Sequence, residues 1–299
     1  MSTKYVIITD STCDLSKEKR EQNNLEYIKM PLARNGVGDF YCDLEWTDFS
    51  PETFYGEMAE GVSYKTSQIN AEDYITALLP HLTAGEDILI LTCSSALSKC
   101  INSALIAKRD LSARFPDRKI LIVDTLRGSL AQGLICLAAA ALRAEGKTID
   151  EVADWVEENR LTFHQVGSVD DLKYLKNAGR VSATAAFFSK IFKIHPLIIS
   201  DVCGNNLAVE KVRGRRKSIT RCIEYVKNTI IDADKQTILV VNANCRPEAE
   251  EISARLLTEV KCKGVEIYPV GPALGASVGP GMFGIYYTGV KVTVGASAE

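Results

Sequence analysis

The stretch DILILTCSSALS, residues 87–98, decides the fold. Its first half is an unbroken run of apolar residues, which is typical of a short β-strand buried on both faces. A cluster of serines follows at once, and the residues from 97 to 111 then have the spacing of a helix. A strand, a polar turn and a helix in this order predict one unit of an α/β fold.

Similar units lie on both sides of this stretch. YVIITD (5–10) and KILIVDT (119–125) are further short apolar strands, and a long helix is predicted over 128–145. Continuous apolar strands that alternate with helices indicate a parallel sheet covered on both faces. We therefore predict a parallel α/β domain over residues 1–160.

The second half of the chain has a different pattern. TFHQVGSV is a strand, and DDLKYLKNAG is a helix that Gly179 ends. A further helix is predicted over SATAAFFSKIF (182–192). HPLIIS and LAVEKVRG then lie on either side of the turn-rich DVCGNN, which predicts a hairpin. This half is therefore predicted to be an α+β domain with a mixed or antiparallel sheet over 161–299, and the fold class is α/β plus α+β.

The composition excludes several classes of protein. The chain has 299 residues and a net charge of −3, so no overall field favours nucleic acid. No apolar run reaches the roughly 20 residues of a membrane helix. The N-terminus lacks a signal-like apolar core, so we expect a cytoplasmic protein. Nine cysteines without a Cys-x-x-Cys pair indicate reduced thiols, with neither disulfides nor a metal site.

Two clusters of hydroxyl side chains are candidates for a binding site. KTSQ places Thr66 and Ser67 in a predicted loop, and TCSSALS places Ser94 and Ser95 at the carboxyl end of the buried strand. Ligands of open α/β sheets bind at that edge, where helix N-termini offer free amides. Hydroxyl donors without a histidine or metal suit the binding of a carboxylate. The alternative is that these side chains only cap helices.

Two short sequences near the C-terminus match a catalytic motif and a cofactor-binding motif, but both lack the neighbouring residues or secondary structure that such a motif requires. GASVG (275–279) fits a nucleophile-elbow pattern around Ser277, but no histidine follows it to act as the base. GPGMFG (279–284) fits a dinucleotide fingerprint, but the nearest predicted strand ends near Val270, and Glu299 is the sole acidic residue that follows the motif. We interpret its glycines as a tight turn before a helix.

A dense basic run, EKVRGRRKS, occupies residues 210–218. No aromatic residues interleave with its cations, which argues against single-stranded nucleic acid as its partner. The run is either a solvated end of the hairpin or a docking patch for an acidic protein.

Nine segments together resemble the DegV family of bacterial proteins. In chain order they are ITDSTCDL, FYGEM, KTSQ, TCSSALSKCINSA, VDTLRGSLAQG, DDLKYLKNAGRVS, IHPLI, KVRGRRKSI and GASVGPGMFG, and the match runs from about Ile8 to Ile285. The resemblance implies a DegV-like, two-domain fold with a fatty acid in a buried tunnel between the domains. It also implies that a separate ATP-dependent fatty acid kinase converts the bound acid to acyl phosphate, so that this chain is a lipid-binding protein and not an enzyme.

The resemblance also implies roles for individual residues. Thr66 and the pair Ser94 and Ser95 match the positions that hold the carboxylate, with the choice between the two serines left open. Arg180 matches the family's arginine after the YLK helix. The positions that resemble the kinase-facing surface are Arg213 and Arg215.

The chain departs from the family pattern beside the head group. Ser277 stands where family members usually have a histidine, and serine is shorter and cannot become cationic near pH 7. Ala96, Lys99 and Cys100 replace the usual Gly, Gly and Thr. These departures leave open how tightly the carboxylate is held and whether a kinase partner exists.

We predict a carrier of a long-chain fatty acid that needs no cofactor and no metal. Burial of the acyl chain would supply the affinity, at roughly 0.8 kcal/mol per methylene. The helix over 131–141 and the side chains of Phe187, Phe188 and Ile191 are candidates for the tunnel lining. The alternatives are a hydrolase with Ser277 or Ser94 as its nucleophile, and a regulatory protein that docks through the basic run.

Overall fold

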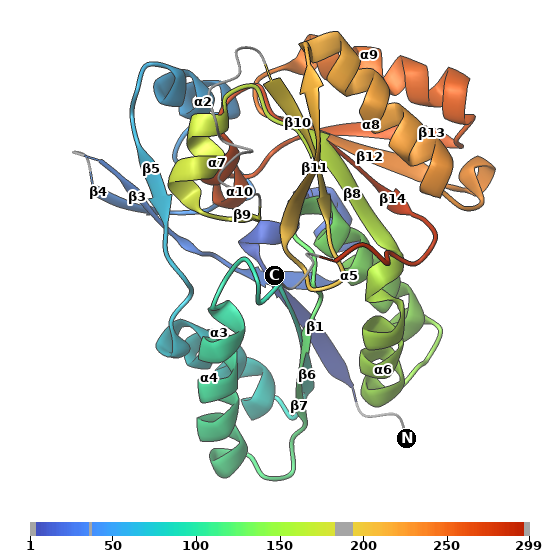
Figure 1. Cartoon of the computed structure of the whole chain (residues 1–299). Helices are drawn as coiled ribbons and strands as arrows, with labels where there is room; N and C mark the ends of the chain where they lie inside the picture. The colour runs from blue at the N-terminus through green and yellow to red at the C-terminus, as the bar shows by residue number, and fades with distance from the viewer. Residues whose placement is uncertain (1–3, 36–37, 183–193, 296–299) are drawn as a thin grey trace.

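The computed structural model describes residues 4–35, 38–182 and 194–295 (Figure 1). A four-stranded sheet forms the centre of the N-terminal half, in the order β2-β1-β6-β7, and every pair in it is parallel. Its strands are β1 (Tyr5–Asp10), β2 (Leu25–Ile28), β6 (Asp87–Thr92) and β7 (Ile120–Asp124). All residues of β1 and β6 are buried, because helices cover both faces. The predicted parallel sheet is thereby confirmed.

Four helices pack on the faces of this sheet (Figure 1). The helices α3 (Ala71–Thr83) and α4 (Cys100–Arg114) pair on one side, and α5 (Ser129–Ala144) and α6 (Ile149–Asn159) pair on the other. The helix predicted to begin at 97 begins at Cys100, because the amides of Leu97 and Ser98 instead close a turn onto the carbonyl of Ser94. That turn lines a cavity.

A small antiparallel sheet extends from the first half in the order β4-β3-β5. Its strands are β3 (Pro31–Arg34), β4 (Gly38–Tyr41) and β5 (Tyr64–Thr66). Thr66, predicted to lie in a loop, is the last residue of β5, because residues 64–66 pair with β3. The remaining short helices of this half are η1 (Ser11–Cys13), α1 (Lys17–Gln22) and α2 (Pro51–Ala59).

The second half contains a seven-stranded mixed sheet in the order β13-β12-β14-β8-β10-β11-β9. Its strands are β8 (Phe163–Ser168), β9 (Val181–Ser182), β10 (Ile194–Ser200), β11 (Asn206–Arg213), β12 (Thr237–Asn242), β13 (Gly264–Pro269) and β14 (Phe283–Thr288). The predicted hairpin is present as the antiparallel pair of β10 and β11. The helices α8 (Arg215–Thr229) and α9 (Arg246–Arg255) pack on one face of this sheet. This confirms the mixed sheet and, with it, the predicted fold class.

Shorter helical segments complete the second half. They are η2 (Arg160–Thr162), α7 (Leu172–Ala178), η3 (Ala233–Lys235), the π-helical η4 (Leu256–Val260) and α10 (Pro272–Val278). Gly179 ends α7 with φ +64, as the sequence predicts. The predicted helix over 182–192, with Phe187, Phe188 and Ile191, lies outside the described residues except for Ser182 in β9. No helix within the described ranges is long and apolar enough to cross a membrane.

The helix α5 packs against both large sheets. It contacts β1 and β6 on one side and β8 and β14 on the other. Small residues permit this position: a Cβ at Gly133 would lie 2.7 Å from the carbonyl oxygen of Cys13. One apolar cluster therefore contains Ile7, Ile135 and Tyr286 together, so the buried core crosses residue 160. The domain boundary at that residue stays a prediction.

The segment after Gly279 corrects one expectation. The glycines of GPGMFG were expected to precede a helix, but the short helix α10 comes before them and the strand β14 comes after. In β14 the residues Phe283, Ile285 and Tyr287 face α8 and α9, whereas Tyr286 joins the other core. A strand could have been predicted here from the alternation of side chains between two faces.

Candidate ligand-binding site

A cavity of about 300 Å3 lies beyond the carboxyl ends of the parallel strands. This head-group cavity collects polar side chains from both halves of the chain. The first half contributes η1, the end of β5, the turn after β6 and the start of α5, and the second half contributes α10 and the second residue after α7. These side chains include Thr12, Thr66, Ser95, Ser129, Arg180 and Ser277. Ligands of open α/β sheets bind at this edge.

Three hydroxyls at this cavity already donate to protein acceptors. Thr12 bonds to Gln132 at 2.6 Å, and Ser129 donates to the Asp14 carboxylate at 2.5 Å. Ser98 donates to the sulfur of Cys100 at 3.1 Å. These side chains hold the walls in place.

Among the other hydroxyls at this cavity, three half-buried ones are available to a ligand. The side-chain oxygens of Thr66, Ser95 and Ser277 have no hydrogen-bond partner within the described part of the chain. All three are half-buried at the same cavity. Because a hydroxyl can donate to any acceptor that enters, this group can bind an oxyanion.

The two adjacent serines have different environments. Ser94 is fully buried, and its hydroxyl donates to the carbonyl of Gly204 at 2.8 Å and accepts from the amide of Ala96. Ser95 lines the cavity, and Ser94 does not. The structure therefore brings Ser95 to the predicted site and uses Ser94 to join the β10–β11 turn to the first half.

Two cations also line the head-group cavity. Arg180 and Lys99 are both exposed, and neither forms an ion pair with any described residue. Arg180 is oriented by its bond from Nη1 to the carbonyl of Ala178, at 2.5 Å. In the sequence, Lys99 stands out only as a departure from the family pattern. Its place at the cavity adds positive charge near the uncommitted hydroxyls, which favours an anionic ligand.

The head-group cavity adjoins two others. An outer cavity of about 450 Å3 shares Thr66, Arg180 and Ser277 with it and is also lined by Lys65 and Lys173. An inner cavity of about 40 Å3 shares a different set of side chains, among them Leu97, Leu175, Leu274 and Val278. The inner cavity lies against β8, β10 and β14 and is mainly apolar. The polar groups thus lie between a charged mouth and an apolar interior.

The geometry around Ser277 differs from that of a nucleophile elbow. Ser277 is near the end of α10, whereas an elbow serine lies on a turn from a strand into a helix. His81 bonds to Glu26 and Glu86, and His164 bonds to the carbonyl of Val290. His195 likewise bonds to a backbone carbonyl. In the described ranges no histidine reaches a serine, and no cluster of three or more metal-ligating side chains occurs.

Two buried carboxyls under the cavity were not singled out from the sequence. Asp10 accepts hydrogen bonds from the amides of Thr12 and Cys93 at 2.9 Å. Asp14 accepts from the Ser129 hydroxyl and from the amide of Gly271. Burial raises the pKa of Asp14 to about 7, against the lowering effect of these two bonds, and Asp10 adds to the rise. Asp10 and Asp14 lie at and just after the end of a predicted buried strand, where ligands of α/β sheets bind, and this position could have identified them as residues near the site.

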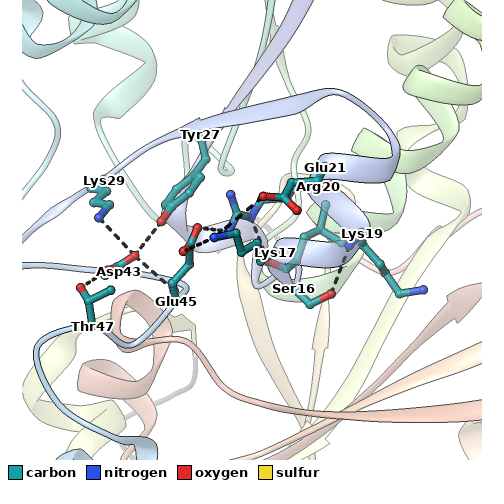
Figure 2. Close-up of polar contacts among 11 residues, drawn as sticks. Ser16, Lys17, Lys19, Arg20, Glu21, Tyr27, Lys29, Asp43, Glu45 and Thr47 are labelled. Atoms are coloured by element: carbon teal, nitrogen blue, oxygen red, sulfur yellow. Dashed lines mark hydrogen bonds and ion pairs between the residues drawn. The ribbon is translucent and has the colours of Figure 1, made fainter.

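A second concentration of polar side chains lies away from the cavity (Figure 2). The carboxylate of Asp43 accepts from the Tyr27 hydroxyl at 2.7 Å, from the Glu45 amide at 3.1 Å and from Thr47. Lys29 lies 3.2 Å from it. Burial alone would raise the pKa of Asp43, but these contacts outweigh it and hold the pKa well below its usual range. This cluster has satisfied partners and fixes the chain before α2.

The two arginines of the basic run differ in their surroundings. Arg213 is exposed at the end of β11. Arg215 begins α8 and forms a bidentate ion pair with Glu248, from Nε to Oε1 at 3.0 Å and from Nη2 to Oε2 at 2.6 Å. Its Nη2 also donates to the carbonyl of Gly281. Arg215 thus anchors the segment between α10 and β14, and the docking role of Arg213 stays a prediction.

Comparison with known proteins agrees with this architecture. The profile described as "Uncharacterised protein, DegV family" matches residues 4–289. A DegV domain-containing protein of Clostridium perfringens is 33% identical over 286 residues, which cover 96% of this chain and 98% of the relative.

Solved structures are similar over the same extent. A DegV lipid-binding protein of Thermotoga maritima has a TM-score of 0.81 and 27% identity, and covers 97% of this chain and 100% of its own. DegV of Bacillus subtilis, described as a fatty acid binding protein, has a TM-score of 0.80 and 27% identity over 96% of this chain and 100% of its own. With the profile match over nearly its whole length, the chain belongs to the DegV family.

Proposed function

We propose that this protein binds one long-chain fatty acid, with the carboxylate in the head-group cavity and the acyl chain in the apolar interior. One observation carries the proposal: the hydroxyls of Thr66, Ser95 and Ser277 are uncommitted at the junction between a cationic mouth and an apolar cavity. The fatty acid binding of the Bacillus subtilis relative supports it.

The acyl chain requires the inner cavity to widen. Its volume of about 40 Å3 is room for only a few water-sized probes. Met282 lines this cavity, and an unbranched thioether side chain repacks at low cost. Each methylene buried there contributes roughly 0.8 kcal/mol, which offsets the cost of rearrangement after a few carbons.

The protein acts without catalysing a reaction in this proposal. A serine nucleophile needs a base within hydrogen-bond reach, and the histidines of the described ranges are bound elsewhere. The outer cavity instead leaves the carboxylate accessible from outside. We propose that a separate ATP-dependent fatty acid kinase meets it there in the cytoplasm, guided by exposed cations such as Arg213.

Mass spectrometry of extracted ligand tests the binding function. Protein purified from a bacterial host and denatured in organic solvent should release about one equivalent of fatty acid, because an enclosed apolar site retains its ligand. A variant with Leu274→Asp, which places a charge between the head-group and inner cavities, serves as the control and should release much less. Absence of acyl species, together with no binding of added oleate, would refute the proposal.

A further inference from the structure

The carboxyl of Asp14 is buried directly behind the wall of the head-group cavity. It lies after η1 with φ +53 and is 5% exposed. Its Oδ2 accepts from the Ser129 hydroxyl at 2.5 Å, and its Oδ1 accepts from the Gly271 amide at 3.1 Å. A Cβ at Gly271 would lie 2.3 Å from Oδ1, so only glycine lets the backbone come this close to the Asp14 carboxyl. Ser129 itself lines the cavity.

The groups around Asp14 are neutral or acidic. Asp10 and Cys13 face it from its own segment, and Cys42 faces it from the segment before α2. Tyr55 of α2 and Tyr286 of β14 complete the surroundings. Among the described residues none forms an ion pair with Asp14. A buried carboxyl without a cation nearby takes up a proton more readily than one in water, and its pKa is raised to about 7.

The protonation of Asp14 decides what Ser129 offers to a ligand. A hydroxyl has one hydrogen, and Ser129 gives it to the ionised Asp14. In that state Ser129 presents only lone pairs to the cavity, which repel a carboxylate. When Asp14 carries the proton, Asp14 donates to Ser129, and the Ser129 hydrogen is free to point into the cavity.

We propose that Asp14 is a positioning residue that couples binding of the ligand carboxylate at Ser129 to the uptake of one proton from solvent. The coupling rests on the proposed function, since it requires an anionic head group in this cavity. The charge balance is simple: one carboxylate enters, Asp14 takes one proton, and the net charge of the buried site stays the same. Like charges a few ångströms apart in a buried site strongly favour this exchange.

The affinity for the fatty acid should decrease with rising pH, because binding is linked to protonation of Asp14. Ligand binding raises the pKa of Asp14 above its value in the free protein, so affinity is full below that value. The affinity then falls as pH rises, by about tenfold per pH unit above pH 7, until the pKa of the complex is reached. The free fatty acid monomer is ionised throughout this pH range, because a carboxylic acid in water titrates at about pH 4.

Isothermal titration calorimetry with oleate measures the coupling. Titrations at about pH 8, in buffers of different ionisation enthalpy, should show uptake of nearly one proton by wild type. Asp14→Asn should bind with no proton uptake and with an affinity that is flat between about pH 6.5 and 8.5. Asparagine tolerates the positive φ, accepts from Gly271 and donates to Ser129.

The outcomes separate this coupling from the binding function. Oleate binding without proton uptake by wild type overturns the coupling, whatever the behaviour of the variant. Equal uptake by wild type and Asp14→Asn also overturns it, since the proton would then go elsewhere. A long-chain alcohol should bind wild type without proton uptake. No oleate binding at any pH refutes the proposed function, and the coupling with it.

Discussion

Replacing Ser95 by alanine, with the same change at Ser94 as its matched control, tests the assignment of the head-group site. The two side chains are adjacent and identical, but only Ser95 lines the cavity. Ser95→Ala should remove one hydrogen bond to the carboxylate, worth about 1.5–3 kcal/mol, and thus weaken oleate binding about 10- to 150-fold. The melting temperature should stay nearly unchanged, because no described residue loses a partner.

Ser94→Ala should show the opposite pattern. It leaves the buried carbonyl of Gly204 without its donor, at a cost of about 1–3 kcal/mol of unfolding free energy, and it also removes the acceptor of the Ala96 amide. Calorimetry should record a melting temperature a few degrees lower, and the folded protein should bind oleate with nearly wild-type affinity. Weaker binding by Ser94→Ala with an unchanged melting temperature, or unchanged binding by Ser95→Ala, would refute the assignment.

Three further predictions follow from the contacts. Thr66→Ala should weaken oleate binding by about 1.5–3 kcal/mol and binding of the matching alcohol much less; equal losses would show that Thr66 is structural. Arg213→Glu should lower acyl phosphate formation by a partner kinase and leave lipid affinity unchanged, whereas Arg215→Glu should destabilise the fold by breaking the Glu248 contact. Asp43→Asn should lower stability by about 1–3 kcal/mol in urea denaturation at neutral pH. That last difference should shrink as pH falls below about 4, since the stabilisation from a depressed pKa is complete only above the unfolded value and is lost as pH falls toward the folded one.

The alternation of strands and helices was predictable from sequence because it depends on local periodicity. The strands β1, β6 and β7 and the helix α5 are found where the apolar patterns predict them. β14 was missed because its glycines were given more weight than its alternating side chains.

The contacts of the helix α5 with both large sheets could not be predicted from the sequence. Its small residues are compatible with any close packing, and nothing in their spacing says that two different sheets will contact them. One apolar cluster therefore contains residues of both predicted domains, a second lies within residues 161–299, and the boundary at residue 160 stays a prediction.

The sequence by itself determined the fold class, the family and the hydroxyl-rich turns at the edge of the parallel sheet, because each depends on residue types along a continuous segment. Only the tertiary structure decided which hydroxyls are available to a ligand. Ser94 finds its acceptor in Gly204, 110 residues away, and Asp14 finds its donor in Gly271, 257 residues away. A hydrogen bond depends on distance in space, so the choice between Ser94 and Ser95, and the coupling of Asp14 to the cavity, exist only once the two halves are packed together.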